Sequence, residues 1–197
     1  MSWAPADGSG VEERLIESSH LLWPESWSPD GRTLAFDELD PVNGWDIWTV
    51  SLDGARKPRP FVQTPFNEWR PTFSPDGRWL AYQSKESGIY EVYVRPFPGP
   101  GPKIQVSTEG GGLPVWGRHG QEILYRNASG IWVVPVDKRS TFSVGLPKKL
   151  FSLPIARNVS TSGFDISPEG RRLLLVNETP IRPTRQLNVI LNWFSVK

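Results

Sequence analysis

The sequence predicts an all-β protein, a β-propeller of four-stranded antiparallel blades, because one short motif recurs along the chain. WSPDGRTLAF at 27–36 is almost repeated by FSPDGRWLAY at 73–82. Weaker copies follow as WGRHGQEILY at 116–125 and ISPEGRRLLL at 166–175. Copies that recur about every 40–50 residues are typical of propeller blades.

The composition supports the same fold class. The 197 residues include 20 Pro, 18 Gly and 10 Trp, and such a density of turn and aromatic residues favours many short strands. The 22 Lys and Arg nearly balance the 21 Asp and Glu, so no basic field for nucleic acid is predicted. The chain has no Cys, which excludes disulfides and thiolate chemistry.

Each copy of the motif presents the same order of predicted elements. An apolar stretch precedes a tight turn that ends in Gly, and a second strand follows: RTLAF, RWLAY, EILYR and RLLLV. The third strands are predicted at DIWTV, YEVYV, GIWVV and NVILNWF, and the fourth at PRPFVQT, PKIQVST and PKKLFSL. Because Pro belongs at sheet edges, the fourth strands are expected to be outermost.

Matching positions of the copies carry matching apolar residues. One set is Leu34, Leu80, Ile123 and Leu173, and a second set, two residues on, is Phe36, Tyr82, Tyr125 and Leu175. A spacing of two places both sets on one face of each sheet, where neighbouring blades would bury them. The predicted blades span 23–64, 65–108, 109–153 and 154–197.

The motif W/F-S-P-D-G-R-x-L-A-F/Y, followed by D-I-W-x-V-x-L-D-G, resembles the TolB-like (WD-like) β-propeller repeat over about residues 25–194. The third copy departs from the pattern, with Gly117-Arg118-His119 in place of Ser-Pro-Asp. STEGGGLPVWGRHGQEILYR and QLNVILNWF are also similar to the C-terminal propellers of bacterial proteins in which a Ser/Thr protein kinase domain and a membrane helix come first. That second resemblance implies an extracytoplasmic sensor or interaction part.

Residues 1–22 allow two interpretations. They are the end of a preceding blade in a larger propeller, or Glu12–Ile16 crosses over as the fourth strand of the last blade and closes a four-bladed ring. Open blade edges would favour self-association. The first residues do not form a signal peptide and no apolar run is long enough to cross a bilayer, so no membrane contact is expected of this segment. We expect an extracytoplasmic location within a longer membrane-anchored protein, and a cytoplasmic one if the chain stands alone.

The sequence contains no recognisable catalytic signature. A Gly-x-Ser-x-Gly elbow, a kinase His-Arg-Asp, a P-loop and a dinucleotide fingerprint are all absent. His20 and His119 are too few for a zinc site. Four carboxylates, at positions 37, 38, 40 and 46, are expected on the loop between the second and third strands, but their spacing matches no calcium loop. No cofactor or metal is therefore predicted.

The best candidate surface comes from the loops that lead into the innermost strands. These loops, at 23–25, 67–70, 111–113 and 161–163, are expected to gather around the central channel. Glu25, Glu68, Trp69 and Arg70 are predicted to contact a partner, because they combine an aromatic anchor with both signs of charge. The alternative is structural: Trp69 packs between blades and Arg70 pairs with Glu25 or Glu68.

The predicted function is a non-catalytic β-propeller that binds protein or peptide partners, as the C-terminal sensor part of a larger bacterial protein. One alternative is the propeller of an enzyme, either a Ser/Thr protein kinase or a prolyl-oligopeptidase-like protein, whose catalytic part lies elsewhere. Another is a TolB-type periplasmic translocation component.

Overall fold

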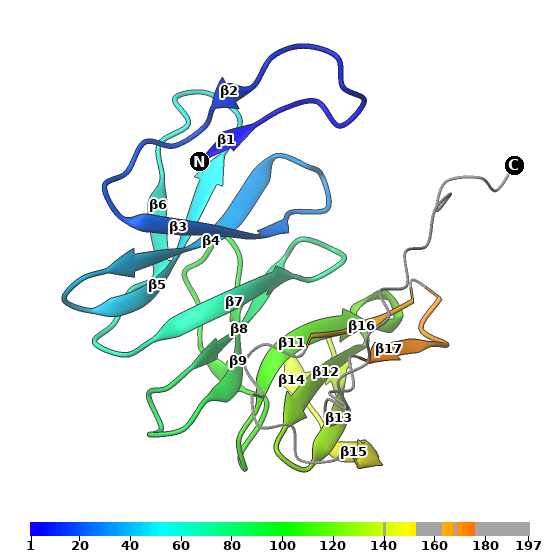
Figure 1. The fold of residues 1–197 in the computed structure, drawn as a ribbon. Coiled ribbons are helices and arrows are strands. Elements are labelled where there is room, and N and C mark those ends of the chain that lie inside the picture. The colour runs from blue at the N-terminus through cyan, green and yellow to red at the C-terminus, as the bar shows by residue number, and fades with distance from the viewer. Residues whose placement is uncertain (140, 153–162, 168, 176–197) are drawn as a thin grey trace, which may run out of the picture.

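The computed structural model describes residues 1–139, 141–152, 163–167 and 169–175, and its regular structure is antiparallel β-sheet with one short 3₁₀ turn, η1 (Figure 1). The first strands are β1 (Ser2–Trp3), β2 (Glu13–Arg14), β3 (Leu21–Trp27), β4 (Thr33–Asp40), β5 (Gly44–Ser51) and β6 (Arg59–Val62). The next are β7 (Glu68–Phe73), β8 (Trp79–Ser84), β9 (Glu91–Pro96) and β10 (Ile104–Gln105). The rest are β11 (Gly112–Gly117), η1 (Arg118–Gly120), β12 (Glu122–Asn127), β13 (Gly130–Asp137), β14 (Ser143–Val144), β15 (Lys148–Ser152), β16 (Phe164–Ile166) and β17 (Leu173–Leu175). The described part of the chain contains no helix that is long and apolar enough to cross a membrane.

After the small β1-β2 sheet, four sheets follow one another in chain order in this described part, and their first strands, β3, β7, β11 and β16, lie next to one another (Figure 1). The first sheet has the order β3-β4-β5-β6 and the second the order β7-β8-β9-β10. In the third sheet β11, β12 and β13 are consecutive, and both β14 and β15 pair with β13. Of the fourth sheet, β16 and β17 are described, and the predicted third strand NVILNWF lies outside the described residues. The predicted all-β architecture of four-stranded propeller blades is confirmed.

The repeated Ser-Pro-Asp-Gly segment is a self-contained turn. In the first blade, the Ser28 hydroxyl donates to Asp30 Oδ1 at 2.5 Å and accepts from the Thr33 backbone N–H at 2.9 Å. Ser74 makes the same pair of contacts, to Asp76 at 2.6 Å and from Trp79 at 3.0 Å. All partners lie within five residues, so the motif specifies its turn locally.

The third blade turns at the same position of the repeat without these side chains and with a different backbone conformation. His119 adopts a positive φ of 55° within η1, where a left-handed conformation is costly for a residue other than glycine. Beside this turn, the third blade approaches the turn of the second blade closely. The Lys138 ammonium donates to Asp76 Oδ2 at 2.8 Å, and a Cβ placed on Gly120 would lie 3.2 Å from Pro75.

The hydrophobic core lies between neighbouring sheets, as the period of two predicts. Between the first and second blades it contains Ala35, Ile47, Val62, Phe73, Leu80, Tyr82 and Tyr93. Between the second and third it contains Ala81, Val92, Val94, Val106, Trp116, Ile123, Tyr125, Val134 and Phe142. The predicted core residues of the first three blades are buried, whereas Leu173 and Leu175 are half-buried.

The outermost strand of the second blade is shorter than the sequence predicts. Only Ile104–Gln105 pairs with β9. The segment before it contains four prolines between positions 96 and 102, which donate no backbone hydrogen bond to a ladder. Phe97 fixes this segment instead, since its ring packs edge-on against Phe73 with ring centroids 4.9 Å apart.

The N-terminal residues form a small arm on the face of the first blade that points away from the second blade (Figure 1). β2 pairs with β1, and the backbone N–H groups of Leu15 and Ile16 both donate to the Met1 carbonyl. Leu15 and Ile16 are buried against the first blade, on Leu34 and Phe36. The partner that the ring-closing interpretation requires for Glu12–Ile16 falls in the last blade, of which only β16 and β17 are described.

Candidate functional site

The loops that lead into β7 and β11 and the hairpins between second and third strands share one face of the sheets. We call this surface the loop face. It comprises residues 41–45, 63–70, 85–90, 107–113 and 126–129, together with residues 23–25 in the first half of β3. The Ser-Pro-Asp-Gly turns occupy the opposite ends of the same strands. Of the fourth predicted loop, only Gly163 is described.

Trp69 is the centre of an aromatic row on the loop face. Its ring stacks on Trp45, with centroids 6.1 Å apart and planes 20° apart, and contacts Tyr90 with centroids 6.0 Å apart. The Arg70 guanidinium lies 5.3 Å from the Trp69 ring centroid, within reach of a cation–π interaction. All three rings of the row are half-buried, so each keeps part of its surface for a partner.

Arg70 occupies a bulge in β7 that the following Pro71 helps to define. Its φ is 60°, and the ladder between β7 and β8 shifts register between Trp69 and Thr72. The Arg70 backbone N–H donates to Asp37 Oδ2 at 3.1 Å, in the preceding blade. Its guanidinium lies 3.5 Å from Glu25 Oε1, so the predicted alternative, pairing of Arg70 with Glu25, is what the structure contains.

The same bulge recurs in the third blade. Leu113 has a φ of 55° and precedes Pro114, and its backbone N–H donates to Gln83 Oε1 at 2.8 Å. Gln83 holds the blade position that Asp37 holds in the first blade. In the first and second blades, a side-chain acceptor on the second strand therefore satisfies the bulged N–H group of the next blade.

Glu25 and Asp37 form a carboxyl pair beside Arg70. Burial, together with the nearby Glu25 carboxylate, raises the pKa of Asp37 to about 9. Burial also raises the pKa of Glu25, against the opposing attraction of Arg70. Asp37 therefore carries a proton at neutral pH.

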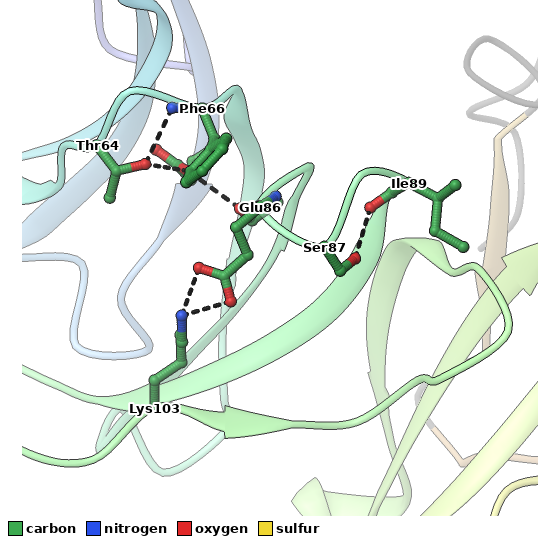
Figure 2. A network of polar contacts seen from close by, with 8 residues as sticks. Thr64, Phe66, Glu86, Ser87, Ile89 and Lys103 are labelled. Atoms are coloured by element: carbon green, nitrogen blue, oxygen red, sulfur yellow. Dashed lines mark hydrogen bonds and ion pairs between the residues drawn. The ribbon is translucent and has the colours of Figure 1, made fainter.

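Glu68 is not exposed to a partner, contrary to the sequence prediction. Its side chain is 1% exposed, and its Oε1 accepts from the hydroxyls of Thr64 at 2.6 Å and Ser84 at 3.0 Å. Thr64 also accepts from the Phe66 backbone N–H (Figure 2). Burial raises the pKa of Glu68. Glu68 is the first residue of β7, and it thus connects the loop before β7, through Thr64, to the end of β8, through Ser84.

Similar buried carboxylates hold the other loops. Glu91, at the start of β9, accepts from the Ser107 hydroxyl and from the Gly110 backbone N–H, the latter at 2.9 Å. Asp46, at the start of β5, accepts from Gln63 Nε2 at 3.2 Å. These contacts fix the loop backbone before any partner arrives.

A cleft of about 350 Å³ opens on the loop face between the second and third blades. It is lined by Gln83, Ile89, Tyr90, Glu109, Gly110, Gly111, Gly112, Leu113, Arg126, Asn127 and Ala128. Its surface is mainly apolar, and Ile89 on its rim is 53% exposed. Tyr90 belongs to both the cleft and the aromatic row, so the two form one continuous surface.

The glycines of the EGGGLP segment permit close approaches rather than anion binding. A Cβ on Gly111 would lie 2.4 Å from Ser107 Oγ, and one on Gly112 would lie 2.7 Å from Gln83 Oε1. Because these glycines carry no Cβ, the chain can turn sharply into β11.

The acidic residues around the β4–β5 hairpin do not gather into a metal site. They lie in the strands themselves, not in a loop, because the hairpin turn takes only residues 41–43. Asp40 Oδ1 accepts from the backbone N–H groups of Val42 and Asn43, and Glu38 accepts from Ser18. Across the described ranges, no group of three or more His, Asp or Glu side chains is arranged to hold a metal ion.

Sequence reasoning missed Asp37, Gln83, Trp45 and Tyr90 as parts of the surface. The signal for them was present in the repeat: Asp37 aligns with Gln83, and Trp45 aligns with Tyr90 directly before a buried carboxylate. These positions are polar or half-buried, so the apolar pattern that marks the core does not single them out.

Comparison with known proteins places the fold. No family model matches the chain, and no curated protein does. Among solved structures, a TolB-type protein from Agrobacterium tumefaciens is similar with a TM-score of 0.64 and 18% identity, over 85% of this chain and 62% of that one. TolB from Acinetobacter baumannii is similar with a TM-score of 0.61 and 18% identity, over 84% of this chain and 40% of that one.

An oligogalacturonate lyase, solved in complex with manganese, is also similar, with a TM-score of 0.64 and 11% identity over 86% of this chain and 51% of that one. The chain thus spans less than two thirds of the length of each of these proteins. At these identities the likeness establishes a TolB-like propeller fold and leaves the activity open.

Proposed function

We propose that this chain is a non-catalytic binding module that holds a protein or peptide partner on its loop face. The observation that carries the proposal is the continuity of the aromatic row of Trp45, Trp69 and Tyr90 with the apolar cleft beside Tyr90. Trp, Tyr and Arg dominate binding hot spots, and Arg70 lies against the row.

The surface is organised in advance of binding. The backbone beneath Trp69 is held by Asp37 through the Arg70 N–H, and the loop before it is held by Glu68. A surface that is already ordered loses little conformational entropy when a partner binds. Of the four residues predicted from sequence, Trp69, Arg70 and Glu25 contribute to the surface and Glu68 supports it.

We also propose that the module is the C-terminal sensor part of a larger bacterial protein, linked to a Ser/Thr protein kinase and acting outside the cytoplasm. The similar TolB chains are considerably longer than this one, which supports a longer parent. Sequencing the gene upstream of codon 1 tests this: an open frame that encodes a kinase domain and a membrane helix is expected, and a stop codon directly upstream would contradict it.

A random peptide library selected on the immobilised protein tests the binding function. Selected peptides are expected to lose at least about tenfold in affinity for Trp69→Ala, because removing a central aromatic anchor costs more than about 1.4 kcal/mol. The matched control is Trp27→Ala, whose ring is 47% exposed at the opposite end of β3. Bound peptides should be recovered intact; their cleavage, or equal losses in both variants, would contradict the proposal.

A further inference from the structure

Resting on that proposed function, we propose that the loop face selects a peptide in which one large apolar side chain is flanked by lysine or arginine. The apolar side chain enters the cleft between the second and third blades, and the flanking cations lie against the acidic rim and the aromatic row. The inference thus names the class of partner that the surface recognises.

The cleft accounts for the apolar anchor. Its volume of about 350 Å³ is at the lower end of the roughly 300–1,000 Å³ found for ligand pockets, which suits a single side chain. Ile89, Tyr90 and Leu113 supply apolar walls. Ile89 is 53% exposed, so a side chain that covers it removes apolar surface from water.

Carboxylates dominate the charge around the cleft. Glu109 is exposed on the rim, whereas Glu91 is buried. Burial is the main cause that raises the pKa of Tyr125 to about 12, and the negative charges of Glu91 and Glu109 add to this shift. Asp46 and Glu86 likewise add to the effect of burial on the pKa of Glu68. The loop face therefore carries a negative field that a cationic partner would relieve.

Lys85 is an exposed cation on this face, whereas the other cations around it are paired or enclosed. Lys103 pairs with Glu86, as Figure 2 shows, and Arg70 pairs with Glu25. Arg126 is in the wall of the cleft and is 4% exposed. The half-buried rings of Trp69 and Tyr90 offer further attraction to a lysine or arginine head group.

The loop backbone argues against an anionic partner. The N–H groups of Gly110, Gly111 and Leu113 donate to Glu91, to the Tyr90 carbonyl and to Gln83 respectively. A glycine-rich loop binds phosphate or carboxylate through such groups, and here they point into the protein.

The probe is a fluorescein-labelled peptide with one Phe flanked by two Lys on each side, compared with versions in which every Lys is Gln or Glu. Fluorescence anisotropy is expected to show that the Lys peptide binds tightest and the Glu peptide weakest, with the difference shrinking in 0.5 M salt, where the screening length is only a few ångström. Equal affinities of the three peptides would overturn the charge selectivity, and equal affinity of a Lys peptide with Ala in place of Phe would overturn the anchor.

Two variants with matched controls locate the site. Glu109→Lys and Ile89→Ser are each expected to weaken the Lys peptide about fivefold. The controls are Asp53→Lys on the opposite face and Val42→Ser, an exposed hairpin tip on the loop face outside the cleft; both should bind normally. Equal losses in variants and controls would overturn the assignment of the cleft. If library peptides still depend on Trp69 while the Lys peptide does not bind, only the partner class fails and the binding function stands.

Discussion

Asp37 Oδ2 accepts the backbone N–H of Arg70 over 3.1 Å, and this hydrogen bond crosses from the second strand of one blade to the first strand of the next. Gln83 repeats it toward Leu113 at 2.8 Å. A carboxyl and a carboxamide are interchangeable here, because only an acceptor oxygen is required. The choice of Asp in the first blade nevertheless has a consequence for stability, since Asp37 titrates and Gln83 does not.

Replacing Asp37 should remove part of the pH dependence of the free energy of unfolding. The folded protein keeps a proton on Asp37 up to about pH 9, whereas the unfolded chain releases it above about pH 4. This contribution to stability is complete below pH 4 and is lost as the pH rises to about 9. Asp37→Asn keeps the acceptor oxygen and stays neutral at every pH. We therefore expect its free energy of unfolding at pH 8 to exceed that of the parent protein by at least about 1 kcal/mol.

Urea unfolding at pH 5 and pH 8 measures this difference. Asp37→Ala is the control, because it leaves the Arg70 N–H without its acceptor and should be less stable than the parent protein at pH 5. An Asp37→Asn protein with the same pH dependence as the parent protein would contradict the assignment of a protonated Asp37.

The bridge from Lys138 to Asp76 should contribute to stability only while Asp76 is ionised. Burial opposes ionisation, but hydrogen bonds from Lys138 and Ser74 lower the pKa of Asp76 to about 2. The stabilisation is present above about pH 4 and is lost as the pH falls through about 2. Lys138→Met should lower the free energy of unfolding at pH 7 by about 0.5–1 kcal/mol.

The matched control for Lys138 is Arg139→Met, measured by the same urea titration. The pair of Arg139 with Asp137 is fully solvated and local, with the Arg139 side chain 90% exposed, so no change is expected. If both variants lose the same free energy of unfolding, the ion pair between blades contributes no more to stability than an exposed ion pair within one blade.

Glu68 should affect stability more than binding. Glu68→Ala removes the acceptor of two hydroxyls and should lower the free energy of unfolding by about 2 kcal/mol, while Glu68→Gln keeps an acceptor oxygen and should lose less. Thermal unfolding measures the loss. In the folded Glu68→Gln protein, peptides selected on the parent protein should bind with unchanged affinity; a loss as large as that of Trp69→Ala would mean that Glu68 contacts the partner.

Gly111 should not accept a side chain. Ser107 is buried and held through Glu91 and the Val92 N–H, so it has little room to yield to a Cβ at 2.4 Å. Gly111→Ala should lower the free energy of unfolding by about 1–3 kcal/mol. Gly163→Ala is the control, since a Cβ there would meet no atom of the described residues within 4 Å. Equal melting temperatures of the two variants would show that the loop adjusts freely.

For Trp69 and Arg70 the sequence allowed either contact with a partner or a structural role, and the structure is compatible with both. Trp69 does pack against other aromatic rings and Arg70 does pair with Glu25, as the structural alternative stated. Both side chains are half-buried and not enclosed, so the same contacts that hold them leave part of each available. Glu68 differs because it begins β7 beneath the loop, a depth that its neighbours in sequence do not reveal.

The sequence by itself determined the blade repeat, the turns and the core. The Ser28 and Ser74 turns are made by contacts within five residues. A strand turns every second side chain to one face, which places Leu80 and Tyr82 together in the core beside the first blade. Only the tertiary structure decided the surface. Asp37 meets Arg70 across 33 positions of sequence, and the cleft requires two blades to be placed side by side. Such contacts depend on the packing angle of whole sheets, which no local pattern of residues specifies.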